Sequence, residues 1–195
     1  MQKREPRSVT LVLGGVRSGK SRFAQNLAQP ASSVAFVATA KPVDAEMRAK
    51  IRRHQQERPK HWRTVEEPVD LARIFATHAS QFDLLLVDCL TIFVANALED
   101  GVETANQRVD AFVEALQSAR ASVVLVSNEV GSGVVPEYPS GRQFRDLLGE
   151  VNQRVAAQAD NVVLMIAGIP LGIKGEIASR VNPPHRSELS LRVQS

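Results

Sequence analysis

Glycines, one lysine and two serines stand close together near the start of the chain. Residues 14–21 read GGVRSGKS and match G-x-x-x-x-G-K-[ST], a spacing typical of phosphate-binding loops, or P-loops. In such a loop several backbone N–H groups point at one anion, and the next helix adds the positive end of its dipole. We expect Lys20 to reach the β- and γ-phosphates of a nucleotide and the hydroxyl of Ser21 to hold Mg²⁺. The expected nucleotide contacts in this stretch are Gly14, Gly15, Val16, Arg17, Ser18, Gly19, Lys20 and Ser21.

The residues on either side of this loop fit the same interpretation. An apolar run over 9–13 predicts a buried strand before the glycines, and residues 21–29 predict a helix after them. A glycine-rich turn without any ligand is the alternative. The full match between a strand and a helix favours phosphate binding.

Polar residues also follow the predicted ends of later strands. Thr39 to Lys41, Asp88, Asn128 with Glu129, and Gly168 each come directly after an apolar run. The carboxyl ends of strands in an open parallel sheet form the ligand crevice, so these signals converge on one edge. We expect Asp88 to share the Mg²⁺ with Ser21, whereas a helix N-cap is the alternative role. Glu129 is either a group that directs a hydroxyl or a turn residue, and the sequence does not decide between them.

One histidine has a helical position that could carry chemistry. Met47, Ile51, His54 and Arg58 are spaced by four, three and four residues, so they share one face of a helix. His54 could be a nucleophile toward phosphorus or a base. From the spacing alone, a half-buried structural histidine is the favoured interpretation. Arg142 and Arg145 could likewise contact phosphates or face solvent.

The whole chain alternates apolar strands with helices. Strands are expected over 9–13, 33–38, 82–87, 123–126 and 162–166, and helices over 21–29, 45–57, 69–78, 90–98, 103–120 and 141–159. Short apolar strands without polar alternation predict a mostly parallel central sheet with helices on both faces. We expect a single α/β nucleotide-binding domain over 1–195, with a polar head over 1–8 and a loose tail over 175–195.

Composition excludes several other classes of protein. The net charge of +3 is mild and scattered, and one Trp and one Tyr offer little for stacking bases, so we expect no nucleic-acid partner. The single cysteine, Cys89, excludes an internal disulfide and fits a cytoplasmic protein. We expect no membrane span, because no apolar stretch is long enough. The four histidines and the cysteine lack the spacing of a zinc site.

Several ordered blocks of sequence resemble one known family, the bifunctional adenosylcobinamide kinase/adenosylcobinamide-phosphate guanylyltransferases of cobalamin biosynthesis. Besides the P-loop, the similar blocks are FVATA at 36–40, DAEM at 44–47, RRH at 52–54, RP at 58–59, HWRT at 61–64, NEVG at 128–131, VP at 135–136, RQFRD at 142–146 and NQR at 152–154. The resemblance covers about 9–174, so the head and the tail look additional.

The resemblance implies two reactions and a set of site residues. ATP or GTP phosphorylates the aminopropanol hydroxyl of adenosylcobinamide, and GMP is then transferred from GTP to that phosphate. His54 matches the histidine that carries GMP as a covalent phosphoramidate. The resemblance also implies a RecA-like P-loop NTPase fold, a homotrimer, and nucleotide contacts from Thr39, Ala40, Lys41, Gln55, Gln56, Glu57, Arg58, Glu66 and Asp88.

Two other functions stay open from the residues themselves. Another small-molecule P-loop kinase would need no covalent histidine. A nucleotide-dependent binding module would need an exposed apolar surface for its partner, and trimer contacts would look similar in the sequence. The residues by themselves indicate Mg²⁺-nucleotide binding and phosphoryl transfer, but neither the corrinoid nor a preference for guanine.

Overall fold

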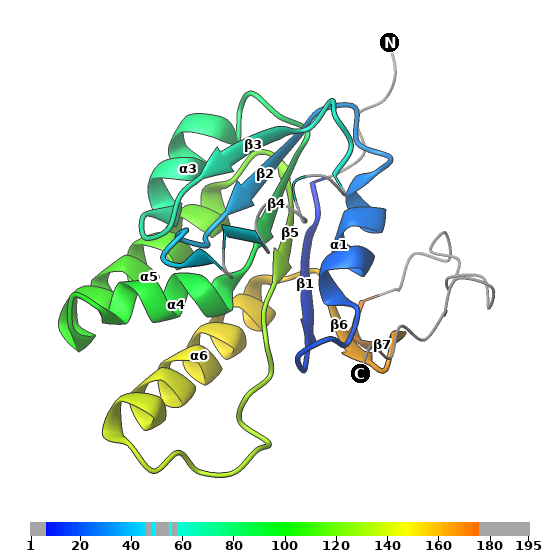
Figure 1. The fold of residues 1–195 in the computed structure, drawn as a ribbon. Coiled ribbons are helices and arrows are strands. Elements are labelled where there is room, and N and C mark those ends of the chain that lie inside the picture. Colours follow the sequence, from blue (N-terminus) through cyan, green and yellow to red (C-terminus); the bar gives the residue numbers. More distant parts are fainter. Residues whose placement is uncertain (1–6, 46–47, 50–54, 56–57, 176–195) are drawn as a thin grey trace.

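A computed structural model of the chain describes residues 7–45, 48–49, 55 and 58–175 (Figure 1). Its centre is a seven-stranded sheet in the order β3-β2-β4-β5-β1-β6-β7. All neighbouring strands are parallel except β6 and β7, which are antiparallel. The strands are β1 (Val9–Gly14), β2 (Val34–Ala38), β3 (Arg63–Glu66), β4 (Leu84–Asp88), β5 (Ser122–Val126), β6 (Asn161–Ile166) and β7 (Ile169–Lys174). The expected mostly parallel sheet is therefore confirmed.

Helices cover both faces of this sheet, as the apolar strands predicted. The helix α1 (Lys20–Ala28) packs on one face, where Phe23 joins Leu86 and Val124 in a buried cluster. The opposite face carries a larger cluster that includes Phe75, Phe112 and residues from the other helices. Those helices are α3 (Leu71–His78), α4 (Leu90–Leu98), α5 (Val102–Ser118) and α6 (Pro139–Gln158).

Two strands differ from the sequence-based expectation. The edge strand β3 has no apolar run, because only one of its four residues is even partly buried. The strand β7 is mostly exposed and follows the turn at Ala167 and Gly168 directly. Neither strand buries enough apolar surface to produce an apolar pattern in the sequence. Backbone pairing of β3 with β2 and of β7 with β6 is what makes these segments strands.

The start of α3 also differs from the expectation. The expected helix over 69–78 begins two residues later, at Leu71. The side chain of Asp70 accepts a hydrogen bond from the backbone N–H of Arg73, so Asp70 is the N-cap. The expected helix over 45–57, the head and the tail lie mostly outside the described residues.

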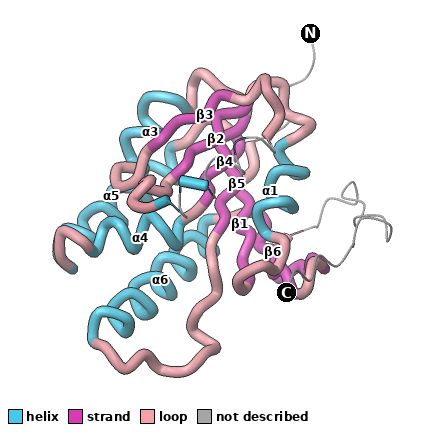
Figure 2. The backbone as a smooth tube through the Cα atoms, in the orientation of Figure 1, coloured by secondary structure: helices cyan, strands magenta, loops and turns pink. Residues whose placement is uncertain are grey.

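A long loop connects β5 to α6. Figure 2 shows the loop between β5 and α6, residues 127–138, running well away from the sheet before α6 begins. Among the described residues, no helix combines the length and the apolar character that crossing a membrane requires.

Candidate nucleotide site

The P-loop joins the last residue of β1 to the first residue of α1. Its backbone turns through positive φ values at Gly14 (149°), Arg17 (56°) and Gly19 (95°). A Cβ atom on Gly14 would lie 2.5 Å from the carbonyl oxygen of Met165 and 2.7 Å from the hydroxyl of Ser18. Only glycine fits at this first position of the motif, because β6 passes too close for any side chain.

The turn between β6 and β7 supports this loop from the side. The N–H of Gly168 donates to the carbonyl oxygen of Ser18 at 3.0 Å. A Cβ on Gly19 would lie 3.5 Å from the Cα of Gly168, which is ordinary contact. Gly168, which the sequence placed at a strand end, therefore lies against the phosphate-binding loop.

The ammonium of Lys20 is held within the loop. Its Nζ donates to the carbonyl oxygen of Gly15 at 2.5 Å and lies 3.5 Å from the Oγ of Ser18. The residue is only 8% exposed. Burial lowers the pKa of Lys20, and the neighbouring Cys89 and Asp88 oppose that shift. Lys20 and Asp88 therefore lie within electrostatic reach of each other.

The sheet register aligns two carboxylates at the same edge. Ala38 of β2 pairs with Glu66 of β3 on one side and with Asp88 of β4 on the other. Residues in parallel register point to the same face of the sheet, and Leu86, two positions before Asp88, packs in the cluster with α1. Glu66 and Asp88 thus belong to one row on the side of the sheet that carries the P-loop helix.

Arg58 completes this group of charges. Its guanidinium carbon lies 3.4 Å from the centre of the Phe36 ring, and NH1 donates to the Oγ1 of Thr64 at 3.2 Å. Burial lowers the pKa of Arg58, while Asp88 and Glu66 oppose that shift. The ring under its planar face therefore holds Arg58 beside both carboxylates. A planar, permanently charged donor is well suited to phosphate.

Relatives with known descriptions share most of this chain. The family described as cobinamide kinase / cobinamide phosphate guanyltransferase matches residues 10–173. The chain belongs to this family. A bifunctional adenosylcobalamin biosynthesis protein CobU of Escherichia coli K12 is 42% identical over an alignment of 178 residues that covers 84% of this chain and 98% of that protein. A bifunctional adenosylcobalamin biosynthesis protein CobP of Pseudomonas aeruginosa is 41% identical over 168 residues, covering 85% and 97%. The resemblance seen in the sequence is confirmed.

Solved structures support the fold of this family member. An ATPase from a bacterial type III secretion system aligns with a TM-score of 0.52 at 11% identity, over 80% of this chain and 50% of that one. A Pyrococcus horikoshii OT3 protein aligns with a TM-score of 0.51 at 8% identity, over 88% of each chain. At such low identity they bear on the fold alone, and they confirm the expected α/β P-loop NTPase fold.

The other residues expected to contact the nucleotide differ in burial, and some of them lie outside the described residues. Thr39 is fully buried, and its hydroxyl bonds with the backbone of Cys89. The Nζ of Lys41 forms an ion pair with Glu99 at 2.5 Å. Gln55 is exposed. His54, Gln56 and Glu57 lie outside the described residues, so their roles stay predictions.

Two residues whose roles the sequence left open, Glu129 and Arg142, shape the loop over 127–138. The N–H of Glu129 donates to the carbonyl oxygen of Gly14 at 3.2 Å, and its carboxylate accepts from the N–H of Gly131 at 2.7 Å. Arg142 donates to the carbonyl oxygens of Pro136 and Glu137. Arg145 lies 3.6 Å from the carboxylate of Asp146. Glu129 therefore links the P-loop to this loop, and Arg142 holds the loop's far end.

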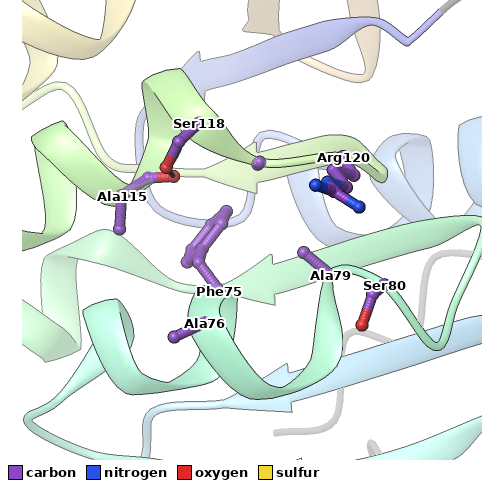
Figure 3. A pocket seen from close by; sticks show the side chains of 8 residues that line it. Phe75, Ala76, Ala79, Ser80, Ala115, Ser118 and Arg120 are labelled. Atoms are coloured by element: carbon purple, nitrogen blue, oxygen red, sulfur yellow. Dashed lines mark hydrogen bonds between the residues drawn. The ribbon is translucent and has the colours of Figure 1, made fainter.

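A separate hollow of about 330 Å³ lies at the other end of the molecule. Its lining comes from the last turns of α3 and α5 and from the residues that follow them, just before β4 and β5 begin (Figure 3). This is the edge opposite the carboxyl ends of the parallel strands. None of the expected site residues that the structure describes belongs to its lining, which consists of Phe75, Ala76, Ala79, Ser80, Ala115, Ser118, Ala119 and Arg120.

Sequence reasoning missed one residue near the site, Asn96. It is 6% exposed within α4 and bonds to backbone beside the strand ends. The available signal was a lone amide in the apolar stretch of residues 90–98, which must find partners if buried.

Proposed function

We propose that this chain phosphorylates the aminopropanol hydroxyl of adenosylcobinamide with ATP or GTP, and then transfers GMP from GTP to the new phosphate. The products are adenosyl-GDP-cobinamide and pyrophosphate. The observation that carries this proposal is the meeting of Lys20, Arg58, Asp88 and Glu66 at one sheet edge beside the P-loop, in a chain of this family.

In the first reaction the chain supplies position and charge. The P-loop N–H groups and Lys20 would bind the phosphates, and Lys20 would meet the negative charge that develops as the phosphoryl group moves. For this, Nζ must exchange the carbonyl oxygen of Gly15 for a phosphate oxygen. The N-terminus of α1 favours the same anion.

The donor set at this edge fits Mg²⁺. The Ser21 hydroxyl and the Asp88 carboxylate offer hard oxygen ligands, and Mg²⁺ takes its remaining ligands from phosphates and water. The described residues include no cluster of three or more His, Cys, Asp or Glu that would suit a metal held by protein alone. Bound there, Mg²⁺ would neutralise charge on the phosphate oxygens.

In the second reaction His54 would act as the nucleophile. A neutral ring nitrogen of His54 attacks the α-phosphorus of GTP, a P–N bond forms, and the bond to the β-phosphate breaks to release pyrophosphate. A phosphate oxygen of adenosylcobinamide phosphate then attacks the same phosphorus and displaces the imidazole. Arg58 supports this assignment, because it lies four positions along the chain and its guanidinium is already at the site.

The remaining contacts complete the proposal. Ala40, Lys41, Gln55, Gln56, Glu57, Arg58 and Glu66 would bind the nucleotide together with the P-loop and Asp88. Thr39 is left out of this set, because its buried hydroxyl is already bonded to the backbone of Cys89. We further propose that the active form is a cytoplasmic homotrimer with RecA-like subunits.

Two labelled nucleotides test this proposal. Incubation with α-labelled GTP, followed by a denaturing gel, should leave label on the protein, and the adduct should be labile in acid and stable in mild base. His54→Ala should abolish this label and the guanylyl transfer. It should retain much of the phosphorylation of adenosylcobinamide by γ-labelled ATP, which needs no covalent nucleophile.

His61→Ala is the matched control, because His61 is exposed beside Trp62 and has no role in the proposal. It should keep both activities. Label that persists on the His54→Ala variant would show that another residue is the nucleophile. Absence of any transfer to adenosylcobinamide would contradict the proposed substrate.

A further inference from the structure

A buried hydroxyl fixes the backbone on the C-terminal side of Asp88. The Oγ1 of Thr39 donates to the carbonyl oxygen of Cys89 at 2.8 Å and accepts from the N–H of Cys89 at 2.9 Å. The N–H of Thr39 lies 3.4 Å from the carbonyl oxygen of Asp88. Thr39 is 0% exposed, so no water competes for these bonds. Residues 88 and 89 are therefore tied to the end of β2.

A buried amide fixes Thr39 in turn. Asn96 donates from Nδ2 to the carbonyl oxygen of Thr39 at 2.8 Å and to that of Pro68 at 3.0 Å. Both hydrogens of the amide are thereby used. Pro68 follows β3 closely, and the N–H of Glu67 donates to the carbonyl oxygen of Ala38 at 2.9 Å. One side chain of α4 thus connects the segments that leave β2 and β3.

We propose that Thr39 and Asn96 are positioning residues that hold the Asp88 carboxylate where it can serve Mg²⁺. This inference rests on the proposed function, because it assumes that Asp88 binds the metal. Mg²⁺ demands near-ideal octahedral geometry, so a small shift of one ligand weakens binding. The two side chains restrict such a shift without touching the nucleotide.

The saturation of the Thr39 hydroxyl supports this role over direct contact. A hydroxyl has one hydrogen to donate, and Thr39 gives it to the carbonyl oxygen of Cys89. A nucleotide bond donated by this side chain would break that link inside the protein. Asn96 has no such competing role, because it is 6% exposed and both of its bonds go to backbone carbonyl oxygens.

The test compares variants by the affinity for a non-hydrolysable ATP analogue, measured by calorimetry with and without Mg²⁺. Thr39→Val keeps the shape of the side chain and removes both bonds, whereas Thr39→Ser keeps the hydroxyl. We expect Thr39→Val to bind the analogue without Mg²⁺ within about twofold of the parent protein. The gain in affinity on adding Mg²⁺ should fall at least about fivefold in Thr39→Val and return in Thr39→Ser.

Asn96→Leu is a second, independent variant. Its gain in affinity for the analogue on adding Mg²⁺ should fall in the same way. Ile74→Val in α3 is the control for general loss of packing, because Ile74 is fully buried and belongs to no site. It should keep the full gain. Equal losses in Ile74→Val, or a full gain in both Thr39→Val and Asn96→Leu, would overturn the positioning role.

Asp88→Asn separates this inference from the proposed function. If Asp88→Asn loses the Mg²⁺ gain while Thr39→Val and Asn96→Leu keep it, the metal assignment stands and the positioning role is wrong. If Asp88→Asn keeps the gain, the metal assignment is wrong and the positioning role fails with it.

Discussion

The buried surroundings of Lys20 suit its ammonium to the binding of a phosphate. It is nearly buried, its ammonium is bonded to the carbonyl oxygen of Gly15, and it lies within reach of Asp88. Burial removes water from the ammonium, so a phosphate that arrives competes with few other partners. A cation in such a place stabilises transition-state charge more strongly than it would in water.

We expect Lys20→Ala to lower the turnover of the phosphorylation step by roughly a hundredfold or more, while the fold stays intact. The measurement is the steady-state rate with adenosylcobinamide and ATP, together with a circular dichroism spectrum. Lys60→Ala is the control, because Lys60 is an exposed lysine with no assigned role. Normal turnover and normal nucleotide affinity in Lys20→Ala would rule out the P-loop assignment.

At the scale of elements, the start of α3 shows how a short helix is fixed beside the site. Glu67 is 4% exposed, and its Oε1 accepts from the N–H groups of Val69 and Asp70 at 3.1 and 2.9 Å. Its other oxygen pairs with the guanidinium of Arg73. Asp70 thus satisfies a backbone donor of the first turn, and Glu67 satisfies the N–H groups of the two residues that lead into the helix.

These contacts predict a pH-dependent contribution to stability. Burial by itself would raise the pKa of Glu67, but hydrogen bonds from Asp70, Arg73 and Val69 outweigh burial and lower it. A lowered pKa in the folded state means that the contribution is complete above the unfolded value, about 4.3, and is lost as the pH falls through the folded value.

We therefore expect Glu67→Gln to lower the free energy of unfolding by about 2 kcal/mol at pH 7, because charged hydrogen bonds are lost. The difference from the parent protein should shrink as the pH falls below about 4.3. Urea denaturation at a series of pH values measures it. Glu114→Gln, at an exposed position of α5, should change little. A difference that is constant with pH would contradict the role of the carboxylate.

At the scale of the whole molecule, the edge of the sheet at β7 leaves apolar side chains uncovered. Ile166, Ile169, Leu171 and Ile173 are 55%, 69%, 51% and 59% exposed. They lie on or beside the last strand of the sheet, which has no neighbour on its outer side among the described residues. Exposed apolar edges of this kind are typical of protein–protein contacts. In the proposed homotrimer, a second copy of the chain would cover this edge.

Light scattering after size-exclusion chromatography should give three times the chain mass of 21.3 kDa. Leu171→Glu should shift the protein toward smaller species, because it places a charge on that edge. Val102→Glu is the control, because Val102 is also exposed but starts α5, away from β7. A parent protein that stays monomeric at every concentration would contradict the trimer. Trimers that tolerate Leu171→Glu would place the contact elsewhere.

The sequence by itself determined the features that depend on neighbouring residues. The spacing of three glycines with Lys20 and Ser21 predicted the P-loop, because backbone N–H groups and a helix start are local features. Continuous apolar runs predicted the five strands that both layers of helices bury. The residues quoted for the family resemblance were enough to predict the family.

Tertiary structure alone decided what depends on partners far along the chain. The strands β3 and β7 carry too little buried apolar surface to be predicted, and they exist through pairing with β2 and β6. The bond from Asn96 to Thr39 spans 57 positions, and no local pattern encodes such a partner. Arg58 meets Asp88 and Glu66 only because the sheet order places β2 between β3 and β4. Spacing along the chain indicates which residues could act, but the order and register of the strands bring them to one edge.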